Sequence, residues 1–389
     1  NKSIDFILNN LNEYPGIKFG LETAIIDLKN QGQKILFASD FTNGKKGIKI
    51  NGLIWIGNKE NILKEIEEKI NEGFSCIKLK IGSMNFKEEI EIISKIRDID
   101  PQMEIRLDAN ESYININDKL ADVFSKEISK LNLNRYPDPY ATKAVEAFAD
   151  FYNIDKKYVT AGNGSDELIS IITSCFLESG DKVVTLTPDF SMYSFYGSLY
   201  ELEVLNYEKN KDTLEFDVDD LINFCNSNNA KMLIFSNPCN PTSLGITRDN
   251  VIKLICNLSC LVVVDEAYMD FWDQSILSEI EKYDNVIVLK TCSKAIGLAG
   301  IRFGFAVAGE KITTALKAAK SPYNTDLVSQ KLVEVTFKNK DILLSNIKEI
   351  TENTQAFYDA FVNLKEKFNS ISCVYRTRTN FIFIKTQYA

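Results

Sequence analysis

A chain of 389 residues with 45% hydrophobic and 25% charged residues is long enough for two or three domains with buried cores. Its net charge of -9 argues against a broad nucleic-acid surface, which needs clustered Lys and Arg, so we expect a small-molecule partner and no nucleic acid. The chain contains no histidine, which excludes Ser-His-Asp and Cys-His catalysis and leaves proton transfer to Lys, Asp, Glu, Tyr or Cys.

The stretch from residue 51 to residue 110 alternates between strand and helix patterns. Strands are predicted in NGLIWIG, CIKLKIG and MEIRLDAN, and amphipathic helices in ENILKEIEEKINEG and NFKEEIEIISKIRDI. An earlier helix in LETAIIDLKNQG is expected to stop at Gly32. Repeated βαβ units build parallel sheets with functional groups at the C-terminal strand ends. Lys78 and Lys80 then share one strand face and Asp108 ends the next strand, although KxK is more often solvated charge.

The pattern changes from about residue 111. A helix, an NRYPDP break and a second helix started by the prolines are predicted within SKEISKLNLNRYPDPYATKAVEAFADFYNI. Helices in DELISIITSCF and SMYSFYGSLY then alternate with strands in KVVTLTP, KMLIFSNP, LVVVDEA, NVIVLKT and RFGFAVAG. Such strands indicate a mostly parallel sheet covered on both faces. The tail, a long helix in DILLSNIKEITENTQAFYDAFVNLKEKF and a strand in NFIFIKT, suggests a smaller α+β region.

The eight cysteines are scattered, without a CxxC pair or metal-finger spacing, and most lie in apolar runs. We expect buried packing thiols, no metal site and a reducing, cytoplasmic location. No apolar run reaches the length of a membrane span and no signal peptide opens the chain, so no membrane partner is expected.

Two of the predicted strand ends carry groups with distinctive chemistry. Lys294 follows a buried strand and a Ser/Thr turn in VIVLKTCSKAIGLAGIRFG. Its amine can condense with an aldehyde, while Ser293 and Arg302 can hold an anionic group. Asp265 ends the apolar strand of LVVVDEAYMDF, and a buried carboxylate needs a cationic partner, of which a protonated pyridine nitrogen is one.

Three further stretches carry groups that match the rest of such a ligand. In IFSNPCNPTS, Asn240 lies on a proline-flanked turn and can donate to a phenolic oxygen, as can Tyr268. In TAGNGSDELIS a glycine turn opens into a helix, so the backbone N–H groups of Ser165 and Asp166 form a phosphate seat. Phe190, in TPDFSMY, can stack on a flat ring.

Each of these motifs has a plainer interpretation as a surface lysine, a helix cap, a turn or a glycine loop. Taken singly, each is more often structural than catalytic. Their joint occurrence, in the order phosphate loop, aromatic, Asn, Asp-x-x-Tyr, Ser-Lys and Arg, favours a site for pyridoxal phosphate.

Residues from about 106 to 389 resemble the fold-type I pyridoxal phosphate enzymes, and most closely the histidinol-phosphate aminotransferases of histidine biosynthesis. The resemblance is carried by LDANES, NRYPDP, GNGSDE, NPCNPTS, DEAYMDF and TCSKAIGLAGIRFG. It implies pyridoxal 5'-phosphate as cofactor, and an amino-acid or phosphate substrate with 2-oxoglutarate.

The resemblance also implies roles for individual residues. Lys294 would bond to the cofactor and move the substrate proton, and Asp265 would pair with the pyridine nitrogen, which makes the ring an electron sink. The remaining cofactor contacts would be Asn240 and Tyr268 at the ring oxygen, Phe190 on the ring face, and Ser165, Asp166, Ser293 and Arg302 at the phosphate.

In that family the tyrosine of the RYP motif, here Tyr136, reaches the phosphate of the neighbouring subunit, so a homodimer is expected. The sequence departs from the family in two places. Ser243 stands where glycine usually follows NPT, a mild change. The family's substrate-carboxylate arginine belongs to a strand beyond NFIFIKT, past Ala389, so we expect cofactor binding to survive better than productive transamination.

Residues 1 to about 110 resemble o-succinylbenzoate synthase of the enolase superfamily, through YPGIKFGLETAIIDL, INGLIWIG, GFSCIKLKIG and EIRLDAN. The resemblance implies a partial (β/α) barrel in which Lys80 is an acid/base group and Asp108 the first of three carboxylate metal ligands. The other ligands and the opposing lysine belong to later strands, and three strands cannot close a barrel. We therefore expect neither a complete metal site nor synthase activity.

These observations predict an α/β protein with the type I pyridoxal phosphate transferase fold. The expected parts are a three-stranded barrel fragment in 1–110, an N-terminal aminotransferase segment in 111–150, a large cofactor domain in 151–320 and a truncated small domain in 321–389. RLDAN is common to both resemblances, which favours a chimera of two truncated genes. Three alternatives stay open. The chain is a threonine-phosphate decarboxylase, or it is an o-succinylbenzoate synthase-like protein of menaquinone biosynthesis, as its N-terminal part suggests, or it is an inactive misjoined product.

Overall fold

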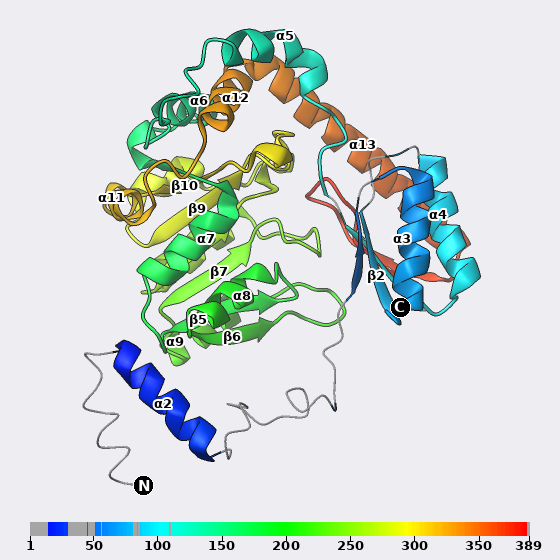
Figure 1. The fold of residues 1–389 in the computed structure, drawn as a ribbon, viewed down its shortest axis with the longest axis horizontal. Helices are drawn as coiled ribbons and strands as arrows, with labels where there is room; N and C mark the ends of the chain where they lie inside the picture. Colours follow the sequence, from blue (N-terminus) through cyan, green and yellow to red (C-terminus); the bar gives the residue numbers. More distant parts are fainter. Residues whose placement is uncertain are drawn as a thin grey trace. The chain divides into compact units, whose positions relative to one another are not determined.

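The computed structural model describes residues 15–29, 45, 51–55, 57–80, 84, 86–108 and 110–386. Figure 1 shows its fold. The chain divides into two compact units, residues 1–109 and residues 110–389. The first described element is α2 (Pro15–Lys29), and its predicted end at Gly32 lies outside the described residues. Of the helices in the described part of the chain, none combines the length and apolar character needed to cross a bilayer.

The first unit contains a three-stranded parallel sheet in the order β1-β2-β3. Its elements are β1 (Gly52–Ile54), α3 (Lys59–Asn71), β2 (Cys76–Lys80), α4 (Phe86–Ile99) and β3 (Glu104–Asp108). The isoleucines of both helices pack with those of the strands in one apolar cluster, which includes Ile54, Ile62, Ile66, Ile77, Ile92 and Ile96. Lys80 and Asp108 are backbone neighbours in the register of β2 and β3.

The second unit is built on a seven-stranded sheet in the order β4-β10-β9-β8-β7-β5-β6. The strands are β4 (Val159–Gly162), β5 (Lys182–Thr187), β6 (Glu203–Glu208), β7 (Met232–Ser236), β8 (Leu261–Asp265), β9 (Val286–Thr291) and β10 (Gly304–Ala308). Only β10 runs against its neighbours, and the other pairs are parallel. The predicted mostly parallel sheet is therefore confirmed.

Helices cover both faces of this sheet (Figure 1). The α-helices of the second unit are α5 (Asn117–Ile128), α6 (Thr142–Tyr152), α7 (Gly164–Cys175), α8 (Met192–Leu199), α9 (Val218–Ser227), α10 (Arg248–Asn257), α11 (Glu310–Ala319), α12 (Leu327–Lys338) and α13 (Lys340–Lys367), of which α13 packs mainly on β11 (Ile371–Val374). Successive strand residues point to opposite faces. In β9, Val286 and Val288 join the core with α6 and α12, whereas Ile287 and Leu289 join the core with α7 and α11.

The second predicted helix of the NRYPDP region begins later than expected. The prolines Pro137 and Pro139 precede it, and α6 starts at Thr142, after Ala141 in a left-handed conformation with φ 49°. Asp138 accepts the N–H of Thr142 at 2.8 Å. A carboxylate that satisfies an early helix N–H group fixes this start, whereas the prolines disfavour a helical conformation in the residues before them.

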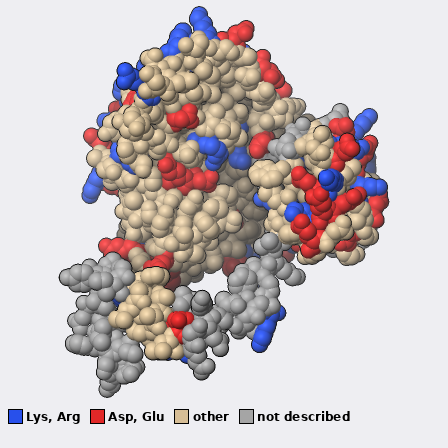
Figure 2. Space-filling view, in the orientation of Figure 1, with Lys and Arg blue, Asp and Glu red and all other residues tan. Residues whose placement is uncertain are grey.

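The sequence pattern missed several short or polar elements. β4 has four residues, and β6 is an edge strand with exposed Glu203 and Glu208. The strand expected throughout NFIFIKT is only β12 (Ile384–Thr386), which pairs antiparallel with the unpredicted β11 (Ile371–Val374). Acidic and basic side chains are interspersed on the face that Figure 2 shows.

The fold predicts a large stability cost for removing the ring of Phe148. This side chain is buried, stacks on Phe305 with ring centroids 4.0 Å apart, and meets Phe337 edge-on. Phe148→Ala should lower the free energy of unfolding in urea by about 3–5 kcal/mol. The exposed Phe357, changed to Ala in parallel, should cost less than about 1 kcal/mol. Equal losses in the two variants would contradict this core.

Candidate active site

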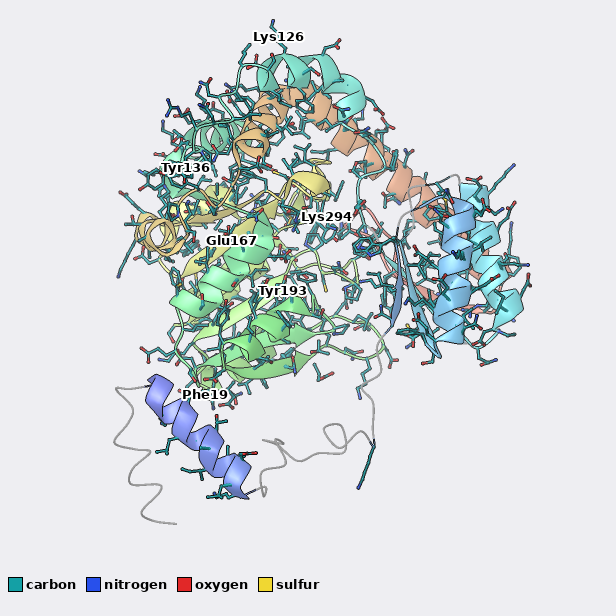
Figure 3. All side chains as sticks on the ribbon, viewed as in Figure 1. Phe19, Lys126, Tyr136, Glu167, Tyr193 and Lys294 are labelled. Carbon is teal, nitrogen blue, oxygen red and sulfur yellow. The ribbon has the colours of Figure 1, made fainter. Side chains whose placement is uncertain are left out.

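A cavity of ≈ 150 Å³ opens at the carboxyl ends of the central strands in the second unit. It brings together nine of the ten predicted cofactor residues: Ser165, Asp166, Phe190, Asn240, Asp265, Tyr268, Ser293, Lys294 and Arg302. Four lining residues were missed from the sequence: Tyr193, Ser236, Ala267 and Thr291. Figure 3 labels Lys294 and Tyr193 in this part of the unit.

Asp265 is a buried carboxylate at the end of β8. Its side chain accepts hydrogen bonds from the hydroxyl of Tyr193 at 2.8 Å and from the N–H of Ala267 at 3.0 Å. No ion pair among the described residues includes it. Burial raises the pKa of Asp265 to about 6, and the charges of Asp189 and Asp166 act in the same direction. A cationic ligand group beside Asp265 would offset this desolvation.

Lys294 lies in the turn after β9. The N–H of Gly297 donates to the carbonyl of Lys294 at 3.1 Å and closes the turn. Gly297 has φ 76°, a left-handed conformation that glycine adopts readily and other residues rarely adopt. The amine of Lys294 is 5.6 Å from the centre of the Tyr268 ring. The lysine lines the cavity together with Asp265.

The hydroxyl of Tyr268 is the meeting point of two side-chain amides. Asn240 and Asn110 each donate to it at 3.3 Å. Asn240 is held in turn by its N–H, which donates to the hydroxyl of Ser236 at 3.2 Å. Asn110 lies in the LDANES stretch, and no local spacing places it beside a tyrosine 158 positions away. This polar cluster can contact an oxygen on a ring that lies between Asp265 and Lys294.

An anion cradle lies at the start of α7. Gly164 opens the helix at φ 78°, and the first N–H groups of a helix have no partner within it. Arg302 donates to the hydroxyl of Ser293 at 3.3 Å and pairs with Asp166 at 3.2 Å. Both contacts place its guanidinium beside the helix start. A hydroxyl, a guanidinium and free N–H groups are the donors that a phosphate requires.

Two glycines keep this cradle open. A Cβ on Gly304 would lie 2.6 Å from the backbone nitrogen of Ser165, and a Cβ on Gly164 would lie 2.9 Å from the guanidinium of Arg302. Any larger residue at Gly304 must displace the backbone of the loop. The described residues therefore fit a ligand with a phosphate, a basic ring nitrogen and a group that reacts with an amine.

Tyr136 is the predicted residue that does not line this cavity. Its side chain is 82% exposed, and its ring stacks on Tyr323 with centroids 4.7 Å apart. Figure 3 shows Tyr136 well away from Lys294 in the view.

The comparison with known proteins agrees with this chemistry. Residues 103–386 match the family model for aminotransferase class I and II. A histidinol-phosphate aminotransferase of Clostridium novyi (strain NT) is 42% identical over 287 residues, which is 73% of this chain and 78% of that protein. One from Thermococcus gammatolerans is 31% identical and covers 77% of this chain and 83% of its own length.

The chain belongs to the class I and II aminotransferases. Its fold is also that of the histidinol-phosphate aminotransferase of Sinorhizobium meliloti in complex with pyridoxal-5'-phosphate, with a TM-score of 0.65, 20% identity and coverage of 72% and 74% of the two chains. The predicted family and type I fold of residues from about 106 onward are thus confirmed. The resemblance of residues 1–110 to o-succinylbenzoate synthase stays a prediction. The structure describes the backbone of Asp108 in β3 but not its side chain.

Because burial raises the pKa of Asp265, replacing its carboxyl group should make the cofactor-free aminotransferase more stable to unfolding. In the cofactor-free protein the folded state keeps the Asp265 proton up to about pH 6, whereas the unfolded chain loses it near the ordinary Asp value. Folding stability is therefore lost as the pH rises through that window. Asp265→Asn removes the loss, so the cofactor-free variant should exceed wild type by about 1–3 kcal/mol at about pH 8 and by less at about pH 5, in urea unfolding. A variant less stable than wild type at both values would contradict the burial cost.

Proposed function

We propose that this aminotransferase binds pyridoxal 5'-phosphate in the cavity and exchanges amino groups between histidinol phosphate and 2-oxoglutarate. The observation that carries the proposal is the convergence of a lysine, a buried carboxylate and an anion cradle around one cavity. The substrate is inferred from relatives 31–42% identical that are histidinol-phosphate aminotransferases. A cytoplasmic reaction, as expected from the sequence, is part of the proposal.

Pyridoxal phosphate, when bound, withdraws electrons from the α-carbon of an attached amino acid. Asp265 would hold the ring nitrogen in its protonated form, because a buried carboxylate is stabilised by a cation. Asn240 and Tyr268 would contact the ring oxygen, and Phe190 would cover the ring face. The N–H groups of Ser165 and Asp166, the hydroxyl of Ser293 and the guanidinium of Arg302 would bind the phosphate.

Lys294 would have two roles in this arrangement. Its Nζ would bond to the cofactor in the resting protein, and the amine would move a proton to and from the α-carbon once the substrate has replaced it. A base that is to act at carbon must be held close to it. The turn closed by Gly297 and the neighbouring ring of Tyr268 limit where this amine can lie.

A homodimer is the second part of the proposal. Tyr136 lies outside the cavity of its own chain and exposes most of its ring, which Tyr323 supports by stacking. A rigid exposed phenol suits contact with a second subunit, because little conformational entropy is lost when it is buried. We therefore propose that Tyr136 donates to the phosphate held by the partner subunit.

Lys294→Ala tests the proposed chemistry directly. The purified wild-type protein should turn yellow with pyridoxal phosphate, keep the cofactor after hydride reduction, and carry it on the peptide that contains Lys294. The variant should retain no reduced cofactor and lose at least about a thousandfold in glutamate formation from histidinol phosphate and 2-oxoglutarate. Lys320→Ala, at a lysine outside the cavity, is the matched control. Label on another lysine in the wild type would contradict the assignment.

The substrate is tested on the same preparation. Histidinol phosphate with 2-oxoglutarate should be transaminated, whereas O-phosphothreonine should release no carbon dioxide. The second arm is needed because the L-threonine-O-3-phosphate decarboxylase of Porphyromonas gingivalis shares this fold, with a TM-score of 0.60, 20% identity and coverage of 72% of this chain and 81% of its own. Carbon dioxide release without glutamate formation would replace the proposed substrate by that alternative.

Tyr136→Phe should weaken pyridoxal phosphate binding by about three- to thirtyfold, because one hydrogen bond to a charged phosphate is lost. The protein should remain dimeric in analytical ultracentrifugation. Tyr140→Phe removes a hydroxyl from a nearby exposed tyrosine and should leave cofactor binding unchanged. A monomeric wild-type protein, or equal affinities in wild type and Tyr136→Phe, would contradict the intersubunit role.

A further inference from the structure

A buried lysine, Lys209, lies near the cavity without lining it. Lys209 follows β6, with 5% of its surface exposed. Its Nζ donates to the carbonyl of Pro188 at 2.8 Å and to the thiol of Cys239 at 3.1 Å, and lies 3.7 Å from a carboxylate oxygen of Asp189. Removing two charges from water is costly, so a lysine and an aspartate buried together need a compensating role or a strong mutual contact.

Asp189 connects this lysine to two loops of the cavity. It accepts the N–H of Phe190 at 2.7 Å, and it accepts both the hydroxyl and the N–H of Ser236. The hydroxyl of Ser236 accepts the N–H of Asn240. Lys209 and Asp189 therefore fix the positions of the proposed ring-stacking aromatic and of the amide at the ring oxygen.

Asp189 is also an electrostatic neighbour of Asp265. Ser236, which Asp189 contacts, pairs with Asp265 in the register of β7 and β8. The charge of Asp189 raises the pKa of Asp265, as that of Asp166 does. The other titratable groups around Asp265 are Tyr193 of α8, which donates to it, and Tyr268, Lys294 and Arg302, which line the same cavity.

We propose that Lys209 is a positioning residue of the aminotransferase reaction, which neutralises Asp189 so that Asp265 can hold its charge for the cofactor ring nitrogen. The proposal rests on the proposed function, because it concerns the same bound ring. Without Lys209, two buried carboxylates at neighbouring strand ends repel each other, and one of them takes up a proton. Asp189 would still accept three hydrogen bonds, from the N–H of Phe190 and from the N–H and hydroxyl of Ser236, whereas Asp265 accepts two, from Tyr193 and Ala267. Asp265 is therefore the carboxylate that loses its charge.

The test uses pyridoxamine 5'-phosphate, which has the same ring and phosphate and cannot condense with Lys294. Its affinity for the full chain is measured by fluorescence titration between about pH 5 and pH 9. Binding should weaken as the pH falls and Asp265 is protonated. Lys209→Gln, which keeps a hydrogen-bond donor and removes the charge, should move the midpoint of this profile up by about one pH unit, a tenfold loss of affinity below the midpoint.

Two further variants separate charge from packing. Asp189→Asn should shift the midpoint in the opposite direction, and Asp189→Asn combined with Lys209→Gln should return it toward wild type. Lys290→Met is the matched control. The Lys290 side chain is as buried as that of Lys209, and its amine pairs with Asp270 at 2.8 Å and contacts the Tyr152 ring on α6. That variant should unfold at lower urea concentration with an unchanged midpoint.

An unshifted midpoint in both Lys209→Gln and Asp189→Asn would overturn the proposal while leaving the proposed function intact. A loss of affinity that persists in the double variant would also overturn it, because packing would then be the cause. If Lys209→Gln does not fold, the downward shift in Asp189→Asn decides alone. Failure of wild type to bind pyridoxamine 5'-phosphate at any of these pH values would refute the proposed function and this inference together.

Discussion

The structure of the active site depends on one unfavourable interaction, the burial of the Asp265 carboxylate at the end of β8. Hydrogen bonds from Tyr193 and Ala267 stabilise its charge only in part, and burial still raises its pKa to about 6. In the proposed function, the protonated ring nitrogen of the cofactor would offset this cost, so part of the binding energy would arise at the group that assists the reaction.

The parallel sheet explains why such a group can be surrounded by the others. Parallel strands end at the same edge, so β7, β8 and β9 deliver Ser236, Asp265 and the turn of Lys294 to adjacent places. The apolar residues before them pack into helices on both faces, which leaves the strand ends as the position where polar side chains meet. The antiparallel β10 begins at this same edge, beside the end of β4 and the start of α7, where Gly304 and Gly164 keep the anion cradle open.

Asp265 and Lys294 could be predicted from the sequence because each follows a strand of apolar residues. Such a strand must be buried, so the polar residue after it lies at the end of a buried strand. The sequence pattern missed Tyr193, although a tyrosine three residues after Phe190 at a helix start can share its side of the helix. It could not predict Asn110 beside Tyr268, because only tertiary packing joins them. Lys209 was missed because it follows the polar edge strand β6 and resembles solvated charge, and its burial depends on the loops at Pro188 and Cys239.

The most direct test of this account is the protonation state of the bound cofactor. Pyridoxal phosphate labelled with nitrogen-15 in its ring, bound to the full chain at about pH 8, reports that state through its NMR chemical shift. If Asp265 pairs with the ring nitrogen, that nitrogen is protonated in wild type and unprotonated in Asp265→Asn. An unprotonated ring nitrogen in wild type would contradict it, since the buried carboxylate would then have no cation beside it.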